Sequence, residues 1–384
     1  MFFKILIMAF KGNNKVDSYI AFAIASSPIL SLIQLLLIHV FQYPEEESTK
    51  IRVLLVVVTM LPAIIICFLR RPKLFLCTYI VIIFIMGLTA FIFPENSQYV
   101  VEEGLRFFLP TVVPSALCLL CLPSIDVFER MMLKLSWVAF FLLLYFTYSL
   151  INGKVLFFTY DMSLSYSALI PAAVLYSQKK VLPYIASFFI FIFIFSLGAR
   201  GPAVVFLVFI FYDLLANNRK AIIPILIIVF FFISFISLFS DYLESLGFTS
   251  RTLKMLLDGE ITQDSGRGNL RSLIYKKLNN SPLWGLGLWG DRPIIGAYCH
   301  NFFLEMCVDF GYLFGPIIIL LFICWLLLLY FKSSKESKKI MMKYVCTIFL
   351  PLQLSSSYLS SYSFGMLIGV LLLIHRESFK SKVL

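Results

Sequence analysis

The chain contains long runs of residues without a single charged side chain. Residues 74–94, 181–199, 310–331 and 344–375 are such runs, and Ile, Leu, Val and Phe are abundant in them. Only 14% of the 384 residues are charged and 60% are hydrophobic, whereas roughly a quarter of the residues in a soluble domain are charged. Because the runs are continuous rather than alternating, we expect helices that span a lipid bilayer and not barrel strands.

Hydropathy along the chain predicts an all-α polytopic membrane protein with about twelve transmembrane helices. One long segment between the ninth and tenth spans is the only extended piece outside the membrane. The predicted spans are residues 17–43, 51–69, 74–94, 105–122, 135–151, 162–177, 181–198, 202–216, 221–240, 301–331, 344–357 and 361–375.

The basic residues predict the orientation of these spans. With the N-terminus inside, most of the 32 Lys and Arg residues fall in inner segments, such as residues 70–73, 179–180 and 332–343. The short outer segments hold few basic residues and carry acidic clusters such as residues 45–47. Positive charge marks cytoplasmic loops, so both termini are expected in the cytoplasm and the number of spans is expected to be even. No small-residue cleavage site follows the basic start of the chain, so we expect no cleaved signal peptide.

The charge and the cysteines could also suggest nucleic-acid binding and metal binding, but both functions are disfavoured. The net charge of +11 follows from the cytoplasmic loops of a polytopic protein, so we expect no nucleic-acid partner. Cys118 and Cys121 form a C-x-x-C pair, but no second pair or nearby histidine completes a metal set, so we expect no metal and no cofactor.

The long outer segment divides the chain into three parts. Residues 1–240 carry nine spans, residues 241–300 form a large periplasmic loop, and residues 301–384 carry three spans and a cytoplasmic tail. The loop has helical apolar spacing and contains Trp284 and Trp289, so we expect it to fold as a small, partly helical cap over the bundle.

Arg200 lies in the sequence SLGARGP, at the outer end of two spans that nearly touch. Gly198 and Gly201 permit a tight turn, and Pro202 suits the first turn of the next helix. Arg200 is either an interfacial arginine that extends its head group to water, or an anion-binding residue held on a hairpin.

Arg267 and Arg271 lie in the sequence SGRGNLRSLIYKKL, where Ser265 and Asn269 are candidate helix caps. Because the two arginines are four residues apart, they lie on one helical face. Two guanidinium groups near a helix N-terminus favour phosphate binding. The alternative is a basic helix that only faces solvent.

The segment GLGLWGDRPIIGAYCHNFFLEM at 285–306 places glycines, an Asp-Arg pair and one of three histidines where the chain re-enters the membrane. His300 is either a structural hydrogen-bonding group or a general base, since an imidazole accepts protons near neutral pH. Glu305 and Asp309, four residues apart, either pair with a buried arginine, orient the histidine region or line a polar cleft.

Three motifs occur together and in order: GARG, SGR-x-x-x-R followed by SPLWGLG, and HNFFLEMCVDFGYLFG. In this order, around one large outer loop, they resemble the O-antigen polymerase and ligase superfamily (the Wzy and WaaL type). The motif similarity covers about residues 196–203 and 265–315. By position, Arg200, Arg267 and His300 match the two arginines and the histidine of the family, although Ala199 stands where the family usually has serine.

The resemblance implies a GT-C-like architecture and a metal-independent glycosyltransferase in the bacterial inner membrane, with its active site on the periplasmic side. The implied substrates are glycans linked to undecaprenyl diphosphate, as donor and acceptor. In this hypothesis Arg200 and Arg267 clamp the diphosphate and His300 activates the acceptor hydroxyl. We expect the substrate to be contacted by the remaining candidates, which are Arg271, Trp284, Gly287, Trp289, Arg292, Asn301 and Glu305.

Three functions are compared. A polymerase, which is favoured because the chain is compact and has no core-binding extension, transfers the growing glycan to another lipid-linked repeat and has a chain-length regulator as a candidate partner. A ligase transfers the glycan to lipid A-core. A flippase or transporter usually carries charges or broken helices near the middle of the membrane, whereas the candidate residues here gather at the outer edge.

Overall fold

The computed structural model describes residues 14–152, 162–197, 200–217, 267–280 and 283–380, and within these ranges the chain forms helices and no strand. The first half contains α2 (Asn14–Ala25), α3 (Ser27–His39), α4 (Glu45–Arg70), α5 (Pro72–Ile92), η1 (Pro94–Asn96), α6 (Ser97–Tyr99), η2 (Val100–Val112), α7 (Val113–Leu120) and α8 (Ile125–Ile151). The second half contains α9 (Met162–Tyr176), α10 (Val181–Ser196), α11 (Arg200–Asn217), α15 (Arg267–Leu278), α16 (Arg292–Ile295), α17 (Phe302–Lys332), α18 (Lys335–Tyr344), η4 (Val345–Phe349), α19 (Leu350–Leu354) and α20 (Tyr362–Lys380).

Five of the described helices are long and apolar enough to cross a membrane, or six if α2 and α3, which are bent by 49° relative to each other, count as one span. The five are Glu45–Arg70, Pro72–Ile92, Pro94–Leu120, Ile125–Ile151 and Phe302–Lys332. Described helices overlap the other predicted spans as well, except residues 221–240, which lie outside the described residues. The number twelve therefore stays a prediction.

The outward faces of α5 and α17 are apolar, which is the pattern of helices that contact lipid. Phe91 on α5 is 83% exposed, and Leu321 on α17 is 63% exposed. A protein in water rarely exposes so large a continuous apolar surface. The structure is thus that of a helical membrane protein.

The core lies where small side chains let helices approach closely. In α9, Ala168, Ala172 and Ala173 are fully buried, and the helix packs against α3, α8 and α10. In α20, a side chain on Gly365 would collide with the carbonyl of Val112, so α20 lies directly against the end of η2 and the start of α7. Such small-residue contacts are typical of helix packing in membranes.

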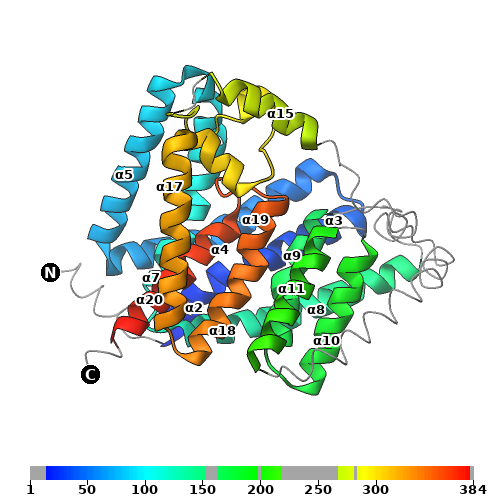
Figure 1. Cartoon of the computed structure of the whole chain (residues 1–384). Coiled ribbons are helices and arrows are strands. Elements are labelled where there is room, and N and C mark those ends of the chain that lie inside the picture. The colour runs from blue at the N-terminus through cyan, green and yellow to red at the C-terminus, as the bar shows by residue number, and fades with distance from the viewer. Residues whose placement is uncertain (1–13, 153–161, 198–199, 218–266, 281–282, 381–384) are drawn as a thin grey trace.

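The helices have two chemically different ends (Figure 1). At the lower end of the view, α18 carries several lysines, and Lys343 pairs with Glu129 of α8. Arg70 pairs with Asp17 at 2.5 Å, at the junction of α4 and α5. At the opposite, upper end lies α15, above the beginning of α17. The lysines of α18, which were expected in the cytoplasm, thus lie at the end away from α15, and the orientation in the membrane stays a prediction.

Candidate functional site

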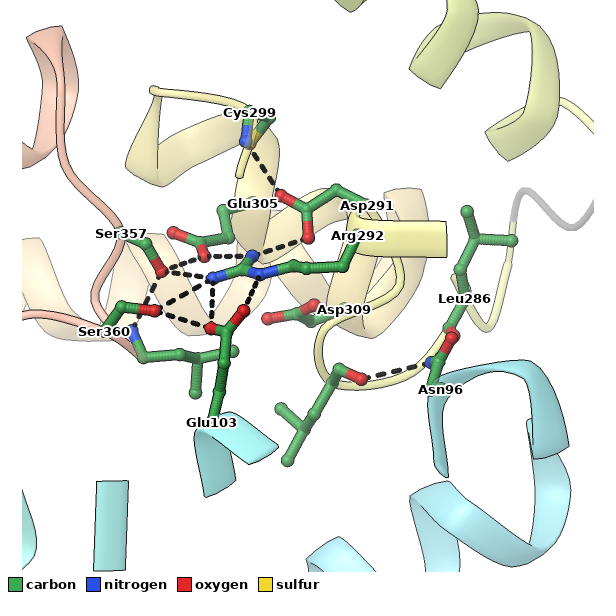
Figure 2. A network of polar contacts seen from close by, with 12 residues as sticks. Asn96, Glu103, Leu286, Asp291, Arg292, Cys299, Glu305, Asp309, Ser357 and Ser360 are labelled. Carbon is green, nitrogen blue, oxygen red and sulfur yellow. Dashed lines mark hydrogen bonds and ion pairs between the residues drawn. The ribbon is translucent and has the colours of Figure 1, made fainter. Parts of the chain in front are cut away.

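Arg292 forms the centre of a buried network of polar side chains at the upper end (Figure 2). Its guanidinium is 1% exposed and donates to Asp291 at 2.6 Å and Glu305 at 3.0 Å. It also donates to Glu103 at 3.3 and 3.4 Å. Burial disfavours the charged guanidinium, but the three carboxylates outweigh that effect and raise the pKa of Arg292 above its usual value. The arginine therefore stays charged while it is fully removed from solvent.

The same network fixes the turn between α19 and α20, residues 355–361, which we name the serine turn. Arg292 donates to Ser357 at 2.9 Å and to Ser360 at 3.2 Å. Ser357 in turn donates to Glu305, and Ser360 donates to Glu103 at 2.7 Å. One cation thus holds together four separate segments, which are η2, the loop before α16, the start of α17 and the serine turn.

The loop at 283–290 lies directly on the backbone of α17. The helix is broken at Gly311, whose φ of 77° is left-handed, and the amide of Leu286 donates to the carbonyl of Val308 at 2.7 Å. Gly285, with φ 75°, faces this break, and a side chain there would meet the Val308 carbonyl at 2.5 Å. On the other side of the loop, Asn96 donates to the carbonyls of Leu286 and Leu288 at 2.7 and 3.1 Å. The loop is therefore positioned from two sides.

Arg267 and His300, two of the three predicted catalytic residues, contact the same residue of the serine turn. Arg267 donates to the carbonyl of Leu354 and, at 3.3 Å, to the hydroxyl of Ser355. The Nδ1 atom of His300 lies 3.2 Å from the carbonyl oxygen of Ser355. The structure thus brings together two residues that are separated by more than thirty positions.

The contact with Ser355 determines which ring nitrogen of His300 carries the proton. A carbonyl oxygen only accepts, so Nδ1 must donate, and in the neutral ring Nε2 then keeps its lone pair. Burial lowers the pKa of His300, and the charges of Arg267 and Arg271 act in the same direction, against the bond to Ser355. His300 also has a left-handed φ of 55°. A neutral, strained histidine with one free nitrogen is suited to accept a proton.

Asn301 begins α17 and also contacts the segment that precedes the serine turn. Its side-chain oxygen accepts from the amide of Leu304 at 2.9 Å, as an N-cap does. Its amide nitrogen donates to the carbonyl of Gln353 at 3.3 Å. These hydrogen bonds of Asn301 hold the neighbouring His300 against the turn. The contact of Asn301 with substrate stays a prediction.

Arg271 and Arg200 lie near this group. Arg271 follows Arg267 by one turn on α15, and its charge affects His300. Arg200 is the first residue of α11. A side chain on the adjacent Gly201 would collide with the hydroxyl of Tyr166 and lie 3.8 Å from Leu354. The start of α11 is thus next to the end of α19, where Arg267 bonds.

The other predicted substrate-contacting residues have different surroundings. Trp289 is fully buried, packs edge-on against Phe108 and offers no ring face to a sugar. Trp284 is 70% exposed and contacts Phe314, so its ring is accessible. Gly287 lies against the ring of Phe93.

Arg292 and Glu305 pair with each other inside the network, so each charge is balanced within the protein, and their contact with substrate stays a prediction. This is the first of the alternatives considered for Glu305, pairing with a buried arginine. Asp309 instead accepts from the hydroxyl of Tyr358 at 2.5 Å.

Sequence reasoning missed the partners that complete the site. Glu103, Asp291, Ser355, Ser357 and Ser360 were not identified as site residues. The signal that was available is the serine-rich turn between two apolar segments, because serines in so apolar a surrounding need partners.

A cavity of about 470 Å³ lies next to the serine turn. Its lining includes Arg52, Arg106, Tyr166, Ser356 and Ser360, but not Arg267 or His300. The cavity and the Arg267–His300 pair are therefore adjacent and share the turn. Among the described residues, no group of three or more His, Cys, Asp or Glu side chains has the arrangement of a metal site.

Comparison of the chain with protein-family models, with curated proteins and with solved structures found no match.

Proposed function

We propose that this protein is a membrane-embedded glycosyltransferase of the O-antigen polymerase type, in the bacterial inner membrane with both termini in the cytoplasm. It transfers a growing glycan from undecaprenyl diphosphate to a lipid-linked repeat unit at the periplasmic face. The observation that carries the proposal is the shared contact of Arg267 and His300 with Ser355. A fixed cation and a neutral imidazole at one turn are the two groups that such a transfer needs.

The chemistry follows from the properties of the substrate. The anomeric carbon of the donor sugar is bonded to an oxygen of the diphosphate, which is a good leaving group. As the acceptor hydroxyl oxygen forms its bond to that carbon, the carbon–oxygen bond to the diphosphate breaks and the electron pair leaves with the phosphate. The hydroxyl proton passes to Nε2 of His300.

Arg267 and Arg271, with Arg200 nearby, supply positive charge for the leaving diphosphate. Guanidinium groups suit this role because their fork of donors matches phosphate oxygens and their charge does not depend on pH. Their hydrogen bonds strengthen as negative charge develops on the departing oxygen, which lowers the energy of the transition state.

Transfer by purified protein tests the proposal directly. The full chain in lipid nanodiscs is mixed with lipid-linked repeat units, and product length is measured on a gel. We expect a glycan ladder from the wild type, at least a hundredfold lower rate for His300→Ala, and partial activity for Arg267→Lys, which keeps the charge but loses the fork. Lys276→Ala, on the same helix as Arg267, is the matched control.

The acceptor distinguishes a polymerase from a ligase. A polymerase extends lipid-linked repeats without lipid A-core, whereas a ligase forms product only when lipid A-core is present. Movement of the lipid-linked unit across the membrane without any new glycosidic bond would identify a flippase and end the enzymatic proposal.

A further inference from the structure

The cavity beside the serine turn has the size and position of a ligand site. Its volume of about 470 Å³ falls in the range of small-molecule pockets. It is enclosed by parts of α3, α4, η2, α9 and the stretch from η4 to α20. None of the residues for which a catalytic role was predicted lines it, so it is a second site.

One wall of the cavity is open toward lipid. Val53, Val57 and Leu61 of α4 line it, and they are 52%, 47% and 51% exposed, respectively. They lie on one helix that is long and apolar enough to cross the membrane. A hydrocarbon chain that enters from the bilayer can therefore lie along α4 without leaving an apolar surrounding.

The polar part of the cavity carries positive charge without a matching negative charge. Arg52 of α4 and Arg106 of η2 both line it, and no Asp or Glu does. Among the described residues, neither arginine has an ion-pair or hydrogen-bond partner, in contrast to Arg70 and Arg292. Two guanidinium groups at a single cavity favour an anion with several oxygens.

The cavity and the Arg267–His300 pair contact neighbouring residues of the same turn. Ser356, Ser360 and Ser361 line the cavity, whereas the neighbouring Ser355 contacts Arg267 and His300. η2 joins the two regions in a second way, because Glu103 belongs to the Arg292 network and Arg106 lines the cavity. A ligand held in this cavity therefore lies against the same turn that contacts His300.

From these observations we infer that the cavity binds the acceptor substrate, an isoprenoid lipid whose diphosphate lies between Arg52 and Arg106. Its hydrocarbon chain lies along Val53, Val57 and Leu61, and the sugar on the diphosphate extends over the serine turn toward His300. The donor occupies the other side, at Arg267 and Arg271. The role as acceptor site and the isoprenoid nature of the lipid rest on the proposed transfer reaction, but the binding of a lipid with a diphosphate head group does not.

Binding of lipid to the cavity is measured in a variant whose donor site is disabled. The full chain carrying Arg267→Gln and Arg271→Gln is placed in phosphatidylcholine nanodiscs, and binding of radiolabelled undecaprenyl diphosphate is determined. We expect saturable binding in this background and at least a tenfold weaker affinity after Arg52→Gln and Arg106→Gln are added, because each removes charged hydrogen bonds. Val57→Trp, which fills the apolar wall, should weaken binding without removing a charge. Lys50→Gln, on the same helix and paired with Glu46 and Glu47, should leave it unchanged.

Two competitors identify the chemistry of the ligand. Undecaprenol, which has the chain without phosphate, should compete poorly, and so should phosphatidylglycerol, which has a phosphate on a different lipid. Equal competition by phosphatidylglycerol would overturn the assignment to an isoprenoid diphosphate, and unchanged binding in the Arg52 and Arg106 variants would overturn the site itself.

The acceptor role is tested separately in the otherwise wild-type chain. Arg52→Gln combined with Arg106→Gln should raise the KM for the acceptor lipid at least tenfold at fixed donor concentration and leave the pH profile of transfer unchanged. If the wild type transfers no glycan while the arginine variants still lose lipid binding, the proposed function fails and the binding site stands. Normal transfer with an unchanged KM for the acceptor would remove only the acceptor role.

Discussion

Arg292 is the residue on which the upper end of the molecule depends most. Asp291 and Glu305 are fully buried, and among the described residues Arg292 is the cation that pairs with both. Replacing it with methionine removes the cation and leaves buried carboxylates without a partner. Loss of one member of such a group typically costs about 3–5 kcal/mol.

We therefore expect Arg292→Met to lower the unfolding temperature of the purified protein by several degrees, as measured by tryptophan fluorescence in detergent. Arg106→Met, which removes an arginine without a described partner, is the control and should have little effect. Equal stability of both variants would mean that the network contributes nothing to the fold.

His300 gives the site a pH dependence whose sign follows from its neighbours. Its pKa is lowered by burial and by the charges of Arg267 and Arg271, so the neutral base persists to a pH below the usual range of about 6.5. The rate of transfer should fall only when the pH drops through that lowered pKa. Arg271→Gln removes one positive charge, which favours the protonated ring and should shift this fall to higher pH. The measurement is the transfer rate between pH 5 and 8, and a shift to lower pH would contradict the assignment of His300 as the base.

At this scale the sequence predicted some site residues and missed others for a physical reason. Arg267 and His300 could be found because each belongs to a short motif of unusual polarity. Glu103 could not, because it acquires its partner Arg292 only through a tertiary contact between residues 189 positions apart. Trp289 looked accessible in a glycine-rich loop, yet the loop folds inward and buries it.

At the scale of elements, the break in α17 and the loop on it form one unit. Gly311 has φ 77° and ψ 174°, a region open almost only to glycine, and a side chain there would collide with the carbonyl of Leu283. Gly311→Ala should therefore cost at least about 2 kcal/mol of stability and release the loop from the helix.

Release of the loop is measured as faster proteolysis of folded protein between residues 283 and 300. Gly87→Ala is the matched control, because Gly87 lies within α5 with no atom within 4 Å of an added side chain. Its stability should change by less than about 1 kcal/mol. A loop that stays protected in Gly311→Ala would show that the close backbone approach is dispensable.

Hydropathy located most elements but not their internal geometry. The predicted segment 105–122 falls in a continuous helix from Pro94 to Leu120, of which Val100–Val112 is π-helical. Apolar spacing does not distinguish this wider winding from an α-helix, since both bring residues three to five positions apart onto one face. The interval between the predicted spans 344–357 and 361–375 falls within the observed turn between α19 and α20, where a run of serines interrupts two apolar segments.

For the whole molecule, the central expectation is that α15 and α18 lie on opposite sides of the membrane. α17 connects the two ends, since it begins at Phe302, next to His300, and ends at Lys332, next to α18. Beyond the break at Gly311, the stretch from Tyr312 to Lys332 contains 21 residues and is roughly 31 Å long, about the thickness of a hydrocarbon core of about 30 Å. The lysines of α18 favour the cytoplasmic side for its end.

Labelling of single cysteines in intact cells tests this orientation. The native cysteines are first replaced by serine or alanine, and the outer membrane of the cells is made permeable. A membrane-impermeant maleimide added outside these cells should then react with Ser272→Cys on α15. Glu336→Cys on α18 should react only after the inner membrane is opened as well. Ser272 and Glu336 are both exposed, so a difference in labelling between them reflects the side of the membrane and not burial. Labelling of both positions from the same side would require α17 to enter and leave the bilayer on one face. Labelling of Ser272→Cys only after the inner membrane is opened would place the Arg267–His300 pair away from the periplasm, where the proposed donor and acceptor meet.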